Sequence, residues 1–170
     1  MGVDSLHFKP LKTQDIDLLI NWFKQPHVAQ WWQAESKLSA VVIREKYEQK
    51  LKIPGQESFI IYSNTHAIGY IQCYDALQCD FDRWSDQPIG TWGIDLFIGE
   101  PSLVGKGLGS AIIKKFKAQL FACPGVTKVI ADPDAANIRA IRCFEKADFI
   151  NSGNRTTPDG LVVLMEFSKS

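Results

Sequence analysis

The sequence predicts a mixed α+β fold in which helices pack on a mostly antiparallel sheet. Segments with helical apolar spacing alternate with short runs that are rich in β-branched and aromatic residues. The 170 residues contain no internal repeat, low-complexity tract or interdomain linker. A chain of this length buries about two-thirds of the surface that its unfolded state exposes. We therefore expect residues 1–170 to form a single domain.

The N-terminal segment is expected to form a strand and two helices. Residues 6–11 have the composition of a strand. Apolar residues then recur at helical spacing up to Pro26, and Thr13 or Asp15 is expected to cap this helix. A second helix is expected over residues 38–51, because a Pro-Gly pair follows it and stops the pattern.

The middle of the chain predicts a β-hairpin, a polar loop and a central strand. Residues 58–62 and 67–74 are β-rich runs on either side of an Asn-Thr turn. A polar loop is expected over residues 75–88. The apolar run 92–98 is the next strand, and the helix that follows it is expected over 110–121.

The C-terminal part predicts a short strand, a helix and a second hairpin. Residues 128–131 are the expected strand, and Asp134 is expected to cap a helix over 137–147. The runs 149–154 and 161–167 are expected to pair across a Thr-Pro-Asp-Gly turn.

Charge and cysteine content indicate which classes of partner to exclude. The 19 basic and 19 acidic residues balance, so no overall field favours nucleic acid or an anionic membrane. The N-terminus lacks the basic and apolar pattern of an export signal. The four cysteines are scattered, without a C-x-x-C pair, which indicates free thiols rather than a metal site or disulfides. We expect a cytoplasmic protein without a metal, as a monomer or homodimer.

A glycine-rich segment, residues 104–110, separates the central strand from the following helix. Three glycines there expose the backbone at a helix N-terminus, where N–H groups and the helix dipole can bind phosphate. The segment does not fit a Walker loop, because Gly107 stands where a magnesium-binding hydroxyl is required. It does not fit the dinucleotide pattern either, because Ser110 replaces the last glycine. The alternatives that remain are a pyrophosphate cradle and a simple helix-entry turn.

Several further motifs accompany this loop in order along almost the whole chain. Gly93-Ile94-Asp95, the glycine loop and residues 132–147 resemble the GCN5-related N-acetyltransferase (GNAT) superfamily. Within it the chain is similar to the aminoglycoside 6′-N-acetyltransferases, through His27-Val28, Trp31-Trp32, Gln56-Glu57-Ser58, Ile68-Gly69-Tyr70, Val126-Thr127-Lys128 and residues 156–160. The resemblance implies a single-domain GNAT fold. In that fold two parallel strands, here 92–98 and 128–131, splay apart and the coenzyme A arm lies between them.

The resemblance also implies acetyl-CoA as cosubstrate and assigns residues to it. These are Leu96, Phe97, Ile98, Val104, Gly105, Lys106, Gly107, Leu108, Gly109, Ser110, Asn137 and Phe144. Asn137 would meet the pantetheine amides; its other interpretation is a first-turn helix residue. Many relatives have tyrosine at position 144, whose hydroxyl can protonate the departing thiolate. Phenylalanine cannot, so the general acid stays unassigned.

Asp95 lies inside the apolar strand run, although Asp is depleted from strands and is rarely buried unpaired. One interpretation is a carboxylate turned to solvent or bonded to nearby backbone. The other is a general base. An alkyl ammonium with a pKa of about 10.4 is on the order of 0.1% free amine at neutral pH, so acetyl transfer to nitrogen must first remove a proton. We assign Asp95 as the catalytic residue.

The loop before the central strand is acidic, with four aspartates against the single Arg83. It indicates a cationic acceptor or, alternatively, a merely solvated loop. Tryptophan and tyrosine rings offer flat faces for sugars and ammonium groups, or serve the core. By resemblance, the acceptor-binding residues are Trp32, Tyr47, Glu57, Trp84, Asp95, Asp132 and Asp159. Asp80 and Asp82 are assigned jointly, because the loop aligns poorly there.

The sequence therefore predicts an acetyl-CoA-dependent enzyme that acetylates the 6′-amine of aminoglycosides by direct attack. The polycationic aminoglycoside is the expected small-molecule partner. One alternative is acylation of another amine or hydroxylamine, such as a siderophore precursor. The other is a non-catalytic acyl-CoA-binding module. Only Phe144, which replaces the proton-donating tyrosine of many relatives, favours this alternative.

Overall fold

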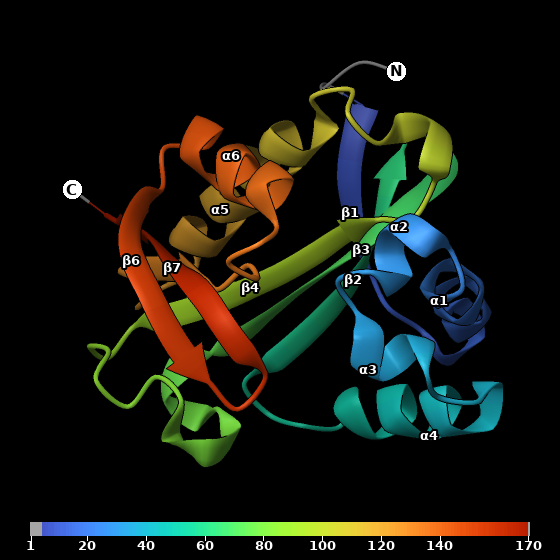
Figure 1. The fold of residues 1–170 in the computed structure, drawn as a ribbon, viewed down its shortest axis with the longest axis horizontal. Coiled ribbons are helices and arrows are strands. Elements are labelled where there is room, and N and C mark those ends of the chain that lie inside the picture. The colour runs from blue at the N-terminus through green and yellow to red at the C-terminus, as the bar shows by residue number, and fades with distance from the viewer. Residues whose placement is uncertain (1–4, 170) are drawn as a thin grey trace. The chain divides into compact units, whose positions relative to one another are not determined.

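A computed structural model describes residues 5–169, whose strands form one seven-stranded sheet in the order β1-β2-β3-β4-β5-β7-β6 (Figure 1). The strands are β1 (Leu6–Pro10), β2 (Gln56–Ser63), β3 (His66–Asp75), β4 (Thr91–Ile98), β5 (Lys128–Ala131), β6 (Ile150–Thr157) and β7 (Gly160–Ser168). β4 and β5 run parallel, whereas β1 with β2, β5 with β7 and β6 with β7 are antiparallel. The predicted mixed fold, with helices flanking the sheet, is confirmed.

The described chain divides into two compact units, each built from two segments. The first contains residues 5–72 and 96–106, and the second contains residues 73–95 and 107–169. Strands β3 and β4 each contribute residues to both units.

The first unit contains four helices: α1 (Ile16–Phe23), α2 (Pro26–Ala29), α3 (Gln33–Ser36) and α4 (Ala40–Lys50). α1 and α4 match the predicted helices, and Ser39 caps α4 by accepting from the Val42 N–H. Asp15 is the N-cap residue of α1, as predicted, but its side chain makes no cap hydrogen bond to that helix. A 3₁₀ turn precedes that helix, and Asp15 accepts instead from the backbone N–H of Lys12 at 2.9 Å.

Aromatic rings form the centre of the first unit. Phe23 on α1, Tyr47 on α4 and Tyr70 on β3 are fully buried. Their ring centroids lie 5.8–5.9 Å apart in the pairs that include Tyr47. Phe97 joins them from β4, with its centroid 5.4 Å from that of Phe23. The burial of these large rings supplies most of the apolar contact that holds the helices on the strands.

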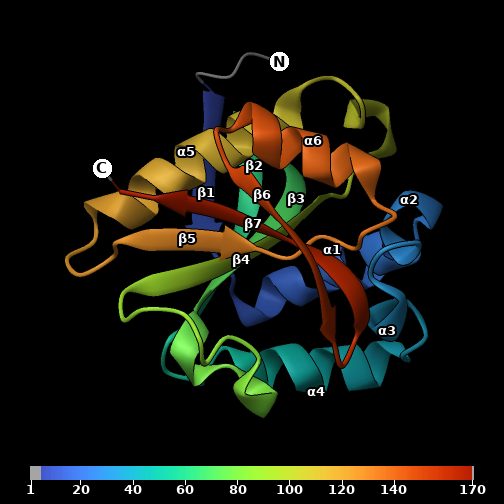
Figure 2. The same ribbon diagram turned by 60° about the vertical axis from the view of Figure 1, so that its left-hand side comes forward.

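The second unit contains α5 (Leu108–Ala122) and α6 (Ile138–Lys146), which pack beside strands β5 to β7 (Figures 1 and 2). Lys117 of α5 ties these elements together. Its ammonium donates to the Ala147 carbonyl at the end of α6 and lies 3.5 Å from the ring centroid of Phe167 on β7. A cation at a helix C-terminus and over an aromatic face is favourable on both counts.

The N-cap predicted for α6 is wrong. Asp134 accepts from the Ala136 N–H in a turn, and Asn137 caps the helix by accepting from the Ala140 N–H at 3.2 Å. Both residue types serve as caps, so local sequence does not choose between them. The predicted loop 75–88 contains two 3₁₀ turns, Ala76–Gln78 and Asp80–Asp82. Each turn is too short to produce a recognisable periodicity in the sequence.

Candidate active site

Strand β4 places Asp95 just beyond the point where the parallel pair separates. Thr91–Gly93 of β4 pair with Lys128–Ile130 of β5. Asp95 lies two residues further along β4, and Asp132 is the first residue after β5. Together with burial, the charge of Asp95 helps to raise the pKa of Asp132, so the two carboxyl groups lie close together. Two acidic side chains therefore meet just beyond the paired part of the two parallel strands.

This carboxyl pair has an unusual charge state. Burial and the neighbouring Asp95 raise the pKa of Asp132 well above its usual range, and the Arg83 guanidinium opposes this only in part. Two close carboxylates cannot both ionise cheaply, so the pair retains one proton at pH values where isolated aspartates are ionised. A cation placed beside the pair would release that proton.

Tyr74 of β3 lies against the same strand. A Cβ at Gly93 would come within 2.2 Å of the Tyr74 ring, so the glycine leaves room for the ring to cross β4. Burial and the charges of Asp95 and Asp132 raise the pKa of the Tyr74 phenol well above its usual value. The phenol is therefore protonated near neutral pH. From the sequence, Tyr74 is one of three tyrosines, with Tyr62 and Tyr70, that could donate a proton or pack in the core, because no local pattern shows which neighbouring strand faces Asp95.

Arg83 links the carboxyl pair to the β6–β7 turn. Its Nη2 donates to Oδ2 of Asp159 at 2.6 Å, and its Nη1 lies 3.5 Å from Oδ2 of Asp132. The turn fixes Asp159, whose backbone N–H donates to Oγ1 of Thr157 at 3.2 Å. The structure thus brings together three of the predicted acceptor residues, Asp95, Asp132 and Asp159, around an arginine that sequence analysis noted only as a loop charge.

Cys79 is a further neighbour of this acidic cluster. Burial and the surrounding carboxylates raise the pKa of its thiol to about 11, against the opposing effect of Arg83. A thiol with such a pKa is protonated at neutral pH and is a poor nucleophile. A covalent acyl-cysteine intermediate is therefore disfavoured at this site.

Trp84 is fully buried in the second unit, packed with Ala76, Ile130 and Leu164. The Arg155 guanidinium lies 4.9 Å from its ring centroid. Of the two interpretations that the sequence left open for Trp84, its burial in this structure fits packing in the core. Asp80 and Asp82, by contrast, are exposed in the second 3₁₀ turn.

The first unit holds the remaining predicted acceptor residues. Trp32 is half-buried and its ring meets that of Phe97 edge-on, with centroids 5.2 Å apart, whereas Trp31 is 36% exposed. The adjacent tryptophans therefore face different surroundings, as their positions in the chain predict. Tyr47 is fully buried, which fits the core alternative for its ring. Glu57 is exposed on β2.

The first unit also contains part of the residue set predicted for acetyl-CoA. Leu96 and Ile98 are half-buried on β4, and Phe97 is buried in the aromatic core. The Ile98 carbonyl accepts from Nε2 of His27 at 2.8 Å, which ties β4 to α2. Val104 is half-buried, and Gly105 and Lys106 are exposed.

The glycine segment forms the entry to α5. Gly107 is its N-cap residue, in the left-handed region with φ of 79°, and a Cβ there would meet no atom within 4 Å. Leu108 is buried beneath the first turn, and the Ser110 hydroxyl donates to the Gly107 carbonyl at 3.3 Å. Open space before a helix of this length fits an anionic group that approaches backbone N–H groups.

Two predicted coenzyme residues on α6 have structural roles. Asn137 is the N-cap residue described above. Its side-chain oxygen is therefore used at the start of the helix, which was the alternative to a contact with the pantetheine amides. Phe144 is buried, with its ring centroid 5.2 Å from that of Phe149. Cys143, one residue earlier, faces α5: a Cβ on Gly109 would lie 2.9 Å from its sulfur.

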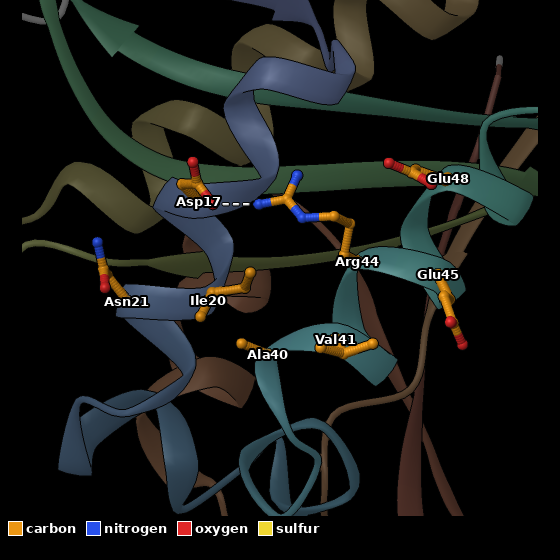
Figure 3. A pocket seen from close by; sticks show the side chains of 8 residues that line it. All are labelled: Asp17, Ile20, Asn21, Ala40, Val41, Arg44, Glu45 and Glu48. Carbon is orange, nitrogen blue, oxygen red and sulfur yellow. Dashed lines mark hydrogen bonds and ion pairs between the residues drawn. The ribbon is translucent and has the colours of Figure 1, made fainter.

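A surface groove elsewhere in the first unit contains none of the predicted site residues (Figure 3). It is lined by Asp17, Ile20, Asn21, Ala40, Val41, Arg44, Glu45 and Glu48. Its main interaction is the ion pair between Arg44 and Asp17, which joins α4 to α1. Within residues 5–169, no group of His, Cys, Asp or Glu side chains is arranged to hold a metal ion, and no helix is long and apolar enough to cross a membrane.

Comparison with known proteins identifies the family to which this architecture corresponds. The family model for the acetyltransferase (GNAT) domain matches residues 12–157. The chain therefore belongs to the GNAT acetyltransferases, and the resemblance seen in its motifs is confirmed.

Particular relatives are similar over almost the full chain. An aminoglycoside N(6′)-acetyltransferase type 1 from Klebsiella pneumoniae is 36% identical over 167 residues, which cover 95% of this chain and 82% of the relative. The structure of AAC(6′)-Ib with paromomycin and acetyl-CoA superposes with a TM-score of 0.92 at 34% identity, covering 98% of this chain and 94% of that one. An N-hydroxyputrescine acetyltransferase from Acinetobacter baumannii is 24% identical over 153 residues, covering 90% and 69% of the two chains.

The glycine segment yields a first prediction. Gly107→Val should weaken acetyl-CoA binding about tenfold, equivalent to roughly 1.4 kcal/mol, because its side chain would fill the space before α5. Gly125→Val is the matched control, since Gly125 also has a positive φ and open surroundings but lies after α5. Calorimetry should show the loss of coenzyme affinity only for Gly107→Val. Equal affinity in two folded variants would show that the cradle lies elsewhere.

The raised pKa of Asp132 yields a second prediction. Ionising Asp132 costs the folded state more than the unfolded state, so this cost grows as pH rises above about 4, the unfolded value. Asp132→Asn removes the cost and should raise Tm at pH 7 by about 2 °C or more, the shift that 1 kcal/mol produces in a chain of this size. The gain should vanish near pH 3, where Asp132 is protonated in both states.

Asp159→Asn is the control for this measurement. It removes an exposed carboxylate that bonds to the same arginine, so it should not raise Tm. A lower Tm for Asp132→Asn at pH 7, or the same gain at both pH values, would contradict the proposed charge state.

Proposed function

We propose that this protein is an acetyl-CoA-dependent N-acetyltransferase that modifies the 6′-amine of aminoglycosides. The observation that carries the proposal is the meeting of Asp95 and Asp132 at the separated ends of β4 and β5, in a chain of the GNAT family. Its similarity to an aminoglycoside N(6′)-acetyltransferase and to AAC(6′)-Ib supports the choice of acceptor.

Asp95 is the proposed general base. The acceptor arrives as an ammonium ion. Its positive charge first causes the carboxyl pair to release the proton that the two groups share. Asp95 takes one proton from the nitrogen, directly or through water, and the free amine attacks the thioester carbonyl carbon. The C–N bond forms, the C–S bond breaks, and the sulfur leaves as coenzyme A thiolate, while the second proton of the attacking nitrogen is lost to water. Asp132, which lies close to Asp95, provides the second carboxyl group that stabilises the cation before transfer.

Acetyl-CoA is the proposed cosubstrate, and the entry to α5 is the element that we assign to its pyrophosphate. Gly107, Leu108, Gly109 and Ser110 present the backbone there, with the positive end of the helix dipole. The side chain of Phe144 has no donor, so it cannot protonate the departing thiolate. A thiol with a reference pKa of about 8.5 gives a good leaving group near neutral pH, and water can supply its proton.

The acidic cluster suits a polycationic acceptor. Asp95, Asp132 and Asp159 gather three carboxyl groups around one guanidinium in the second unit, although the chain as a whole is neutral. A local negative field of this kind attracts ammonium groups without binding anionic polymers. We further propose that the enzyme acts in the cytoplasm, as a monomer or homodimer.

Acylation of another amine is the second candidate function. The similarity to an N-hydroxyputrescine acetyltransferase, at 24% identity, is the observation that favours it. Such an acceptor carries a second cationic nitrogen, which the same carboxyl groups would bind. A non-catalytic acyl-CoA-binding module is disfavoured, because a buried, proton-sharing carboxyl pair is costly to keep without a use for it.

Acceptor selectivity tests the proposed function. Kanamycin, which carries a 6′-amine, should be acetylated at that nitrogen, whereas an aminoglycoside with a 6′-hydroxyl should be a poor acceptor, because a hydroxyl carries no charge to bind the carboxyl pair. Thiol release and mass spectrometry of the product measure both outcomes. Equal turnover of the two compounds, or turnover only of a hydroxylamine, would overturn the assignment.

The role of Asp95 is tested by a substitution that removes its charge and keeps its size. Asp95→Asn should lower kcat/KM by roughly 10²-fold or more, because removal of a general base usually costs that much, while acetyl-CoA binding is retained. Asp86→Asn is the matched control, since Asp86 is an exposed loop aspartate that pairs with Arg155. Near-normal turnover by Asp95→Asn would exclude the base assignment.

A further inference from the structure

Arg83 occupies the position between two of the carboxyl groups that we assign to the acceptor. Its guanidinium contacts Asp159 at 2.6 Å and Asp132 at 3.5 Å, residues that lie 76 and 49 positions away in sequence. Both contacts use oxygen Oδ2 of the aspartate. An ammonium group of a bound acceptor would use the same acceptor oxygens.

The loop holds Arg83 firmly enough for this contact to matter. Asp82 before it adopts a left-handed conformation with φ of 48°, and Trp84 after it is fully buried. Two turns flank the residue, through Ser85 N–H to Asp82 O at 3.1 Å and Gln87 N–H to Trp84 O at 3.0 Å. The Arg83 side chain itself is only 21% exposed. The fixed loop and the partial burial already restrict the Arg83 side chain. Forming its ion pairs therefore costs less conformational entropy than in a typical surface ion pair.

The charge of the cluster remains incompletely balanced with Arg83 in place. The hydrogen bond and charge of Asp159 outweigh burial and raise the pKa of Arg83, so the guanidinium stays charged. Its 3.5 Å approach to Asp132 is too long to hold that carboxyl ionised beside Asp95. Arg83 thus satisfies the exposed Asp159 well and the buried Asp132 poorly. The cluster can still accept a cation at the carboxyl pair, but Asp159 is already engaged.

We propose that Arg83 is a specificity-determining residue, a tethered cation that competes with a second, non-reacting ammonium group of a polycationic acceptor for Asp159. The inference rests on the proposed function, since it takes this carboxyl group as part of the acceptor site. An acceptor with several ammonium groups must displace the guanidinium or leave one of its own groups unpaired. An acceptor that brings only the reacting amine does not meet this competition.

Removal of the tethered cation should therefore strengthen binding of polycations selectively. For Arg83→Ala, calorimetry without acetyl-CoA should give a Kd for kanamycin about tenfold lower than that of the unaltered protein. KM should fall in parallel while kcat changes little, because Asp95 is untouched. With methyl 6-amino-6-deoxyglucoside, which carries the reacting amine alone, kcat/KM should stay within about twofold. Arg83→Lys retains a cation and should give a Kd close to that of the unaltered protein.

Arg44→Ala is the matched control. Arg44 also forms an exposed pair with an aspartate, Asp17, and its removal changes the net charge equally, but the pair lies in the first unit and outside the proposed site (Figure 3). Its Kd for kanamycin should stay within about twofold. Arg83→Gln, which retains a polar side chain without the charge, replaces Arg83→Ala if thermal unfolding shows that the alanine variant is unfolded.

The outcomes separate the inference from the proposed function. An unchanged or higher Kd for kanamycin in folded Arg83→Ala or Arg83→Gln would overturn the inference, because Arg83 would then be neutral or would organise the carboxyl groups for binding. Tighter binding of both kanamycin and the monoamine would also overturn it, as a general charge effect. Selective tightening with no acetylation of kanamycin would support the tethered cation and reject the proposed activity.

Discussion

The closeness of the Asp95 and Asp132 carboxyl groups is the constraint on which the chemistry proposed for this protein depends. Two carboxyl groups are brought together because two parallel strands stop pairing after Gly93 and Ile130, and each strand then presents an aspartate. Burial makes it costly for both groups to ionise, so they retain a proton and a capacity for cations. The proposed substrate arrives as an ammonium ion, which the pair can bind, and must lose protons to become an amide, which a carboxylate of the pair can accept.

The surroundings of the carboxyl pair come from elements that are remote in sequence. Tyr74 approaches from β3 because Gly93 has no side chain, and Asp159 is supplied by the turn between β6 and β7. Arg83 connects these groups from a loop that is fixed by a buried tryptophan. The resulting cluster is acidic but not fully compensated, as the proposed acceptor site requires.

Aromatic residues that sequence motifs assign to the acceptor are divided between surface and core. Tyr47 and Trp84 are fully buried, each in the hydrophobic core of its own unit, whereas Trp31 keeps more than a third of its surface exposed. Trp84 also anchors the loop that carries Arg83, because it follows Arg83 directly and is fully buried. Phe144 is likewise buried, and it packs on Phe149.

The sequence by itself determined the positions of the main helices and strands, because apolar periodicity and glycine placement are local properties of the chain. The resemblance of its motifs, which are also local, indicated the GNAT family and, through it, the parallel strand pair. The sequence also singled out Asp95, since an aspartate in an apolar strand needs a reason that neighbouring residues do not provide. Only the tertiary structure decided that Asn137 rather than Asp134 caps α6, because both are suitable residues and the backbone geometry chooses between them. It likewise decided the partners of Arg83 and the raised pKa of Asp132. Coulomb energy and desolvation depend on distances and burial in space, and the groups concerned lie on separate segments of the chain.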